Sequence, residues 1–173
     1  PYTFVNEGGK SSMQLLRELK AVLATKSVTG ENVPMDNPMA KSRVTDIEFL
    51  ANQELFAITV DDLSISLWNS GAILCAPAHA GSTAGQCPVK RVFATTPQTM
   101  LRWHKPTNTL YTAGPASHVT AWRVIRKKEE KEIEFSMITK LSKHRGMITD
   151  MLVVPEEGIG GGNGYLVTSS VDK

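Results

Sequence analysis

The sequence predicts an all-β fold of repeated four-stranded antiparallel sheets, preceded by a helical segment. Two observations support this prediction. From Val44 onward, apolar and polar residues alternate, which is typical of half-buried β-strands. The pattern also repeats, because Trp68 and Trp122 end corresponding strands about 50 residues apart. This internal repeat is the strongest pattern in the sequence.

Residues 1–43 differ from the rest and are predicted to form a separate N-terminal segment. Apolar residues recur there at helical spacing, and polar residues occupy the opposite face. The apolar residues are Leu15, Leu16, Leu19, Val22 and Leu23. With Ser12 as the N-cap, this spacing predicts a helix over 12–26, followed by a linker over 30–42 that contains glycine and proline. We expect the helix to pack on the sheets that follow it or to belong to a preceding domain; the alternative is docking on a partner helix.

Residues 44–173 contain three units of alternating sequence. The predicted strands are 44–49, 55–60 and 64–68 in the first unit, 100–103, 110–113 and 118–122 in the second, and 147–154 and 165–170 in the third. Residues 89–93 and 133–138 supply candidates for a fourth, outer strand. Four short antiparallel strands that repeat in this way form a blade of a β-propeller. The predicted blades are 44–95, 99–140 and an incomplete 144–173, so the predicted fold is an incomplete β-propeller.

The end blades of an incomplete propeller lack neighbouring blades on which to pack. A single blade buries its two faces only against adjacent blades, and a propeller closes with at least about four of them. We therefore expect either that this chain is a piece of a longer protein, which supplies the remaining blades, or that further chains complete the ring.

Three segments resemble the tryptophan–aspartate (WD) repeat family of β-propellers. Residues 62–69 resemble the third strand of a WD blade, with Asn69 where the final Asp usually stands. Residues 144–151 resemble the histidine, turn glycine and first strand with which a blade begins, and residues 166–173 resemble the second strand and its turn. The resemblance covers about residues 44–173.

The resemblance implies a structural hydrogen-bond relay from a loop histidine through a Ser or Thr and a Trp to a turn Asp. In the third unit, His144, Thr168 and Asp172 match this pattern. In the first unit, Asp62 and Trp68 match, but Ile58 stands where the hydroxyl is expected.

The second unit departs further from the family pattern. Ala116 replaces the Asp, so Trp122 is expected to lack that partner. The blades are therefore expected to be less regular than a full WD repeat.

Composition limits the class of protein. Lys plus Arg number 19 and Asp plus Glu 17, a net charge of +2, and this balance disfavours a dedicated nucleic-acid or membrane-surface protein. No apolar run approaches the ~18 residues that span a bilayer. Two cysteines are too few for a disulfide scaffold, which favours a reducing compartment and hence the cytoplasm.

The sequence disfavours metal and phosphate sites. Cys75, His79, Cys87 and His104 could form a zinc set, but their spacing matches no closed zinc motif, and a loop thiol with solvated histidines is favoured. Residues 158–164 are rich in glycine, but a strand follows them where a phosphate loop needs a helix. We expect no metal and no cofactor.

Catalytic and charged patterns also have simpler interpretations. Asp46 and Asp150 occupy corresponding positions, and Asp61 and Asp62 share a turn, so paired carboxylates could in principle act as acid and base. Strand residues that face solvent or the channel are favoured instead, and no enzyme is predicted. The mixed-charge run 126–132 is interpreted as a solvated loop.

The resemblance implies a non-catalytic protein–protein interaction scaffold, of a family found in assembly, signalling and cytoskeletal complexes. Binding is expected on loops held by the rigid blades, with 70–87, 126–132 and 155–164 as candidates because they are longer than blade closure needs. The alternative is a propeller that binds nucleic acid or a modified basic tail at the channel mouth.

Overall fold

The structure, a computed structural model, describes residues 43–71, 88–127, 132–154 and 164–172. The described strands are β1 (Val44–Leu50), β2 (Leu55–Val60), β3 (Ser64–Asn69), β4 (Lys90–Phe93), β5 (Met100–His104), β6 (Thr109–Ala113), β7 (Val119–Lys127), β8 (Glu132–Leu141), β9 (Ile148–Val154) and β10 (Tyr165–Ser170). A single 3-10 turn, Ala51–Gln53, joins β1 to β2. The predicted helix over 12–26 and its linker lie outside the described residues.

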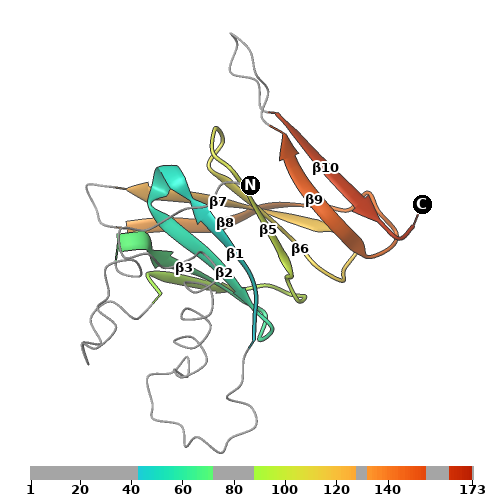
Figure 1. Cartoon of the computed structure of the whole chain (residues 1–173), viewed down its shortest axis with the longest axis horizontal. Coiled ribbons are helices and arrows are strands. Elements are labelled where there is room, and N and C mark those ends of the chain that lie inside the picture. The colour runs from blue at the N-terminus through green and yellow to red at the C-terminus, as the bar shows by residue number, and fades with distance from the viewer. Residues whose placement is uncertain (1–42, 72–87, 128–131, 155–163, 173) are drawn as a thin grey trace, which may run out of the picture. The chain divides into compact units, whose positions relative to one another are not determined.

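The strands form three separate sheets (Figure 1). Two have four strands, in the orders β1-β2-β3-β4 and β5-β6-β7-β8, and the third pairs β10 with β9. Consecutive strands pair antiparallel, as in Leu110 opposite Trp122 and Thr168 opposite Met151. The prediction of an all-β fold with four-stranded antiparallel sheets is confirmed.

The main core lies between the first two sheets. Alternate residues of β2 and β3 point to this core, so Leu55, Ala57, Ile65 and Leu67 are fully buried. The opposing sheet contributes buried residues from each of its four strands, namely Leu101, Leu110, Trp122, Val124, Ile133 and Phe135. This packing of two sheet faces holds the first two sheets together.

A second, smaller core joins the second sheet to β9 and β10. Ile148 and Met151 of β9 are buried there, and they pack with Val119 of β7 and Ala113 of β6. Leu166 of β10 packs against the same cluster. The other face of β9 and β10 is apolar but exposed, with Leu152, Val154, Tyr165 and Val167 on it.

Two glycines stand where the backbone of one turn approaches another segment. A Cβ on Gly114, just after β6, would lie 2.1 Å from the carbonyl oxygen of Pro97. A Cβ on Gly146, before β9, would lie 2.7 Å from Cγ2 of Val171. Both sites need glycine because its lack of a side chain permits the close approach.

Candidate functional site

The structure brings together the three residues of the third unit that match the WD relay. His144 Nδ1 lies 3.1 Å from Asp172 Oδ1, and His144 Nε2 lies 2.9 Å from Thr168 Oγ1. The carboxylate can only accept, so Nδ1 donates to it, and a neutral imidazole then accepts the hydroxyl proton of Thr168. The backbone N–H of Arg145 donates to Asp172 Oδ2. Together these bonds connect the loop before β9 to β10 and the turn after it.

The same bonds stabilise the charged form of Asp172. The hydrogen bond from the backbone N–H of Arg145 lowers the pKa of Asp172 from 3.8 to about 2, with smaller contributions from Ser170 and His144. Asp172 therefore remains an acceptor across the neutral and mildly acidic range.

In the second sheet, Trp122 has a partner that the sequence analysis missed. Its indole Nε1 donates to Thr112 Oγ1 at 3.0 Å, and both side chains are buried. Thr112 holds the place on the second strand of its sheet that Thr168 holds in the third. Comparing the second strands of the units would have revealed this hydroxyl.

In the first sheet, the indole of Trp68 uses a hydroxyl from its own strand. Ile58 does occupy the position of the missing hydroxyl, and Trp68 Nε1 donates to Ser66 Oγ at 2.8 Å instead. The Ser66 hydroxyl in turn donates to the carbonyl of Ile58. Asp62 accepts a hydrogen bond from the backbone N–H of Ser64 at 2.9 Å, which closes the turn between β2 and β3.

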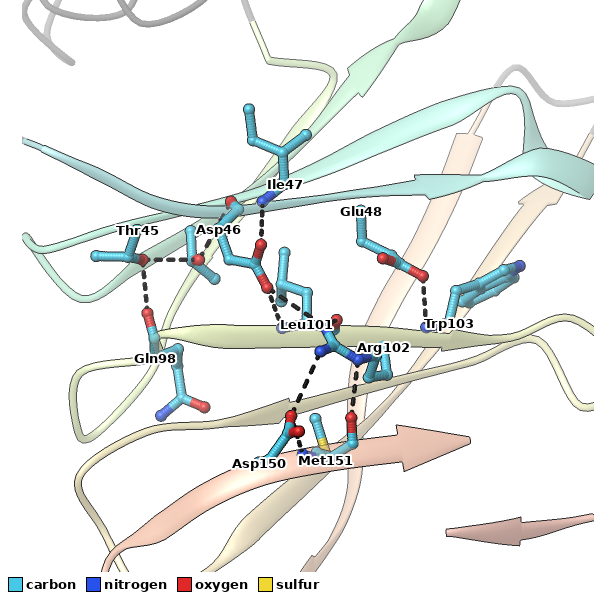
Figure 2. Close-up of polar contacts among 11 residues, drawn as sticks. Thr45, Asp46, Ile47, Glu48, Gln98, Leu101, Arg102, Trp103, Asp150 and Met151 are labelled. Carbon is cyan, nitrogen blue, oxygen red and sulfur yellow. Dashed lines mark hydrogen bonds and ion pairs between the residues drawn. The ribbon is translucent and has the colours of Figure 1, made fainter. Parts of the chain in front are cut away.

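Carboxylates of β1 bind the backbone of β5, as Figure 2 shows. Asp46 Oδ2 accepts from the N–H of Leu101 at 2.8 Å, and Glu48 Oε1 accepts from the N–H of Trp103 at 3.1 Å. Side chains two residues apart on β1 thus accept hydrogen bonds from N–H groups two residues apart on β5. The two strands therefore run side by side in the same direction. Burial raises the pKa of Glu48, and the Trp103 N–H partly offsets this effect.

Arg102 of β5 links all three sheets (Figure 2). Its Nε donates to the carbonyl of Met151 on β9 at 2.8 Å. Its two terminal nitrogens lie 3.7 Å from Asp46 Oδ2 and 3.6 Å from Asp150 Oδ1. The repeated aspartates thus flank an arginine and bind backbone N–H groups, an arrangement that joins sheets.

The three candidate loops attach at one end of the sheets. In an antiparallel sheet the first-to-second and third-to-fourth connections share an end. β9 runs in the direction of β5, because its first residue, Ile148, donates to Ala116 in the turn between β6 and β7. The connections 70–89, 128–131 and 155–164 therefore all join their strands at the same end of the sheets.

A cavity of about 570 Å³ opens at this end between the first two sheets. Its charged lining residues are Glu54, Lys90, Arg126, Lys127 and Glu132. The N–H of Arg126 donates to Gln53 Oε1 at 2.8 Å, and its guanidinium lies 3.7 Å from Glu54. Residues 126, 127 and 132 belong to β7 and β8, so within the predicted loop 126–132 the strands extend further than expected.

The described residues include only part of the hypothetical zinc set and of the glycine-rich segment 158–164. His104 is buried and its Nδ1 lies 2.7 Å from Thr107 Oγ1. Cys75, His79, Cys87 and the glycines over 158–163 lie outside the described residues. Among the residues that are described, no group of three His, Cys, Asp or Glu side chains could hold a metal. Within that same part of the chain, no helix has the length and apolar character to cross a membrane.

Comparison with known proteins places the chain by fold. No protein-family model matches it, and neither does any curated protein. It is similar to a solved structure, the crystal structure of Sqt1 of Saccharomyces cerevisiae, a WD-repeat protein, with a TM-score of 0.55 and 11% sequence identity. The match covers 82% of this chain and 32% of Sqt1, so the chain spans well under half the length of that protein. The likeness shows a shared fold.

Proposed function

We propose that the chain is a non-catalytic scaffold for protein–protein interaction, built from WD-type propeller blades. One observation carries the proposal: the connections 70–89, 128–131 and 155–164 attach at the same end of adjacent, tightly packed sheets. Loops held by a rigid scaffold are a common place for partner binding, and these sheets present three connections at one end. The fold shared with Sqt1 supports the same conclusion.

The blades in this proposal are 44–95, 99–140 and 144–173, and the segment before them is separate. The matched residues Asp62, Trp68, Trp122, His144, Thr168 and Asp172 have a structural role: they hold turns and strands in place. Further blades, from the same longer protein or from another chain, cover the apolar face that Leu152, Val154, Tyr165 and Val167 expose.

The charges at the loop end favour a protein partner over a nucleic acid. Lys90, Arg126 and Lys127 share the cavity with Glu54 and Glu132, and Arg126 is held by Gln53 and Glu54. A nucleic-acid surface needs a stripe of one sign, which a mixed lining does not provide. We place the protein in the cytoplasm, where cytoskeletal complexes are one setting for such a scaffold.

The experiment replaces two of the three connections at the loop end of the sheets. In one variant, 72–87 becomes a Gly-Ser linker of equal length; in a second, 155–163 does. The matched control changes the opposite end, where Ser117→Gly alters the turn between β6 and β7. Proximity labelling in cells should identify proteins that the wild type and the control share and that either replacement loses. Equal labelling by all four chains would contradict the proposal.

A further inference from the structure

A second cavity lies between the outer strands of the first two sheets. It has a volume of about 250 Å³. Residues of β4, of the following connection, of β7 and of β8 line it, including Phe93, Thr95, Gln98, Trp122, Met137 and Lys140. None of the connections proposed above to bind partners contributes to this lining, so the cavity is a distinct surface.

The lining combines an exposed apolar side chain with a buried aromatic one. Met137 of β8 is 54% exposed, although it belongs to a strand. Trp122 lies opposite Met137, lines the same cavity and is only 6% exposed. An exposed apolar side chain beside a concave, aromatic-lined cavity is typical of a site that takes an apolar side chain from a partner.

The cavity has one cation without an anion. Lys140 Nζ donates to Thr95 Oγ1 at 3.1 Å, and among the described residues no carboxylate forms an ion pair with it. Burial lowers the pKa of the neighbouring His118, and the charge of Lys140 lowers it further. An acidic group would complement this positive end of the cavity.

We propose that this outer groove binds an extended segment of a partner protein that carries a large apolar residue followed closely by an acidic one. The apolar side chain packs beside Met137 over Trp122. The carboxylate pairs with Lys140. Two independent features of one cavity thus specify the chemistry of one occupant.

The test is a selection of random 12-residue peptides displayed on phage against the full 173-residue chain. Selected peptides should carry an apolar residue with Asp or Glu within four positions. Their synthetic versions should bind Lys140→Glu and Met137→Ser at least tenfold more weakly than wild type. Lys105→Glu, an exposed charge reversal on the hairpin between β5 and β6, should bind them unchanged.

A second selection tests the role of charge directly. Peptides selected on Lys140→Glu should replace the acidic residue by Lys or Arg and keep the apolar one. Far-ultraviolet circular dichroism confirms that each variant keeps its sheets. The proposal is overturned by selected peptides without the apolar–acidic pattern, by equal affinity for wild type and Lys140→Glu, or by a selection that enriches no peptide.

Discussion

Asp46 on β1 accepts a hydrogen bond from the backbone N–H of Leu101 on β5 at 2.8 Å, while its other carboxylate oxygen accepts from the N–H of Ile47. One side chain therefore satisfies N–H groups in two different sheets. The contact supplements the apolar core, because it fixes which residues of the two inner strands lie opposite each other. The same carboxylate lies beside Arg102, so its removal affects both partners.

Asp46→Ala should lower the free energy of unfolding by about 1–3 kcal/mol, because it leaves the Leu101 N–H without an acceptor. Urea denaturation followed by tryptophan fluorescence measures this loss. Glu132→Ala, which removes an exposed carboxylate at the start of β8, is the matched control and should change stability by less than about 0.5 kcal/mol. Equal effects of the two substitutions would show that the Asp46 contact adds nothing.

Arg102 and Asp150 should differ strongly in how much each contributes to the free energy of unfolding. Arg102→Met removes a charged donor from the carbonyl of Met151 and should cost about 1.5–3 kcal/mol. Asp150→Asn should cost less than about 1 kcal/mol, because its side chain is 73% exposed and its ion pair is screened. A double-mutant cycle in low and high salt measures the coupling, which salt should reduce. A large, salt-independent coupling would contradict this interpretation.

The pH dependence of stability should report the state of Asp172. Its pKa is about 2 in the folded protein against 3.8 without these contacts, so the folded state favours the carboxylate. Its contribution is therefore fully present above the higher value and is lost as pH falls through the lower one. The stability difference between wild type and Asp172→Asn should be constant from pH 5 to 7 and shrink between about pH 4 and pH 2. A difference that does not change with pH in that window would mean that the pKa is not lowered.

The sequence predicts the strands well because side chains alternate between the two faces of a sheet, which imposes a period of two where those faces differ in polarity. It also predicts the grouping of His144, Thr168 and Asp172, which the structure brings within hydrogen-bond distance. In the second sheet, strand pairing follows from turns of a few residues, so Thr112 could have been matched to Trp122 by comparing the units.

Contacts between sheets cannot be predicted from the sequence in the same way. Whether Asp46 meets Leu101 depends on how one sheet is shifted against the next, and no local pattern encodes that shift. The bonds of Arg102 depend on the same geometry. The outer groove could not be predicted from the sequence either, because Phe93, Gln98 and Lys140 are brought together only by packing of the two sheets.

Alanine substitutions of three glycines should separate close approach from ordinary turn flexibility. Gly114→Ala should destabilise most, by about 3 kcal/mol, because its Cβ would lie 2.1 Å from the rigid backbone oxygen of Pro97. Gly146→Ala should cost about 1–2 kcal/mol, since the nearest atom, 2.7 Å away, belongs to the Val171 side chain, although the Asp172 backbone nitrogen is also close at 3.0 Å. Gly71→Ala is the control, because its nearest neighbour is 3.4 Å away in ordinary contact. Thermal denaturation ranks the three, and the reverse order for Gly114 and Gly146 would show that the Pro97 backbone can move aside.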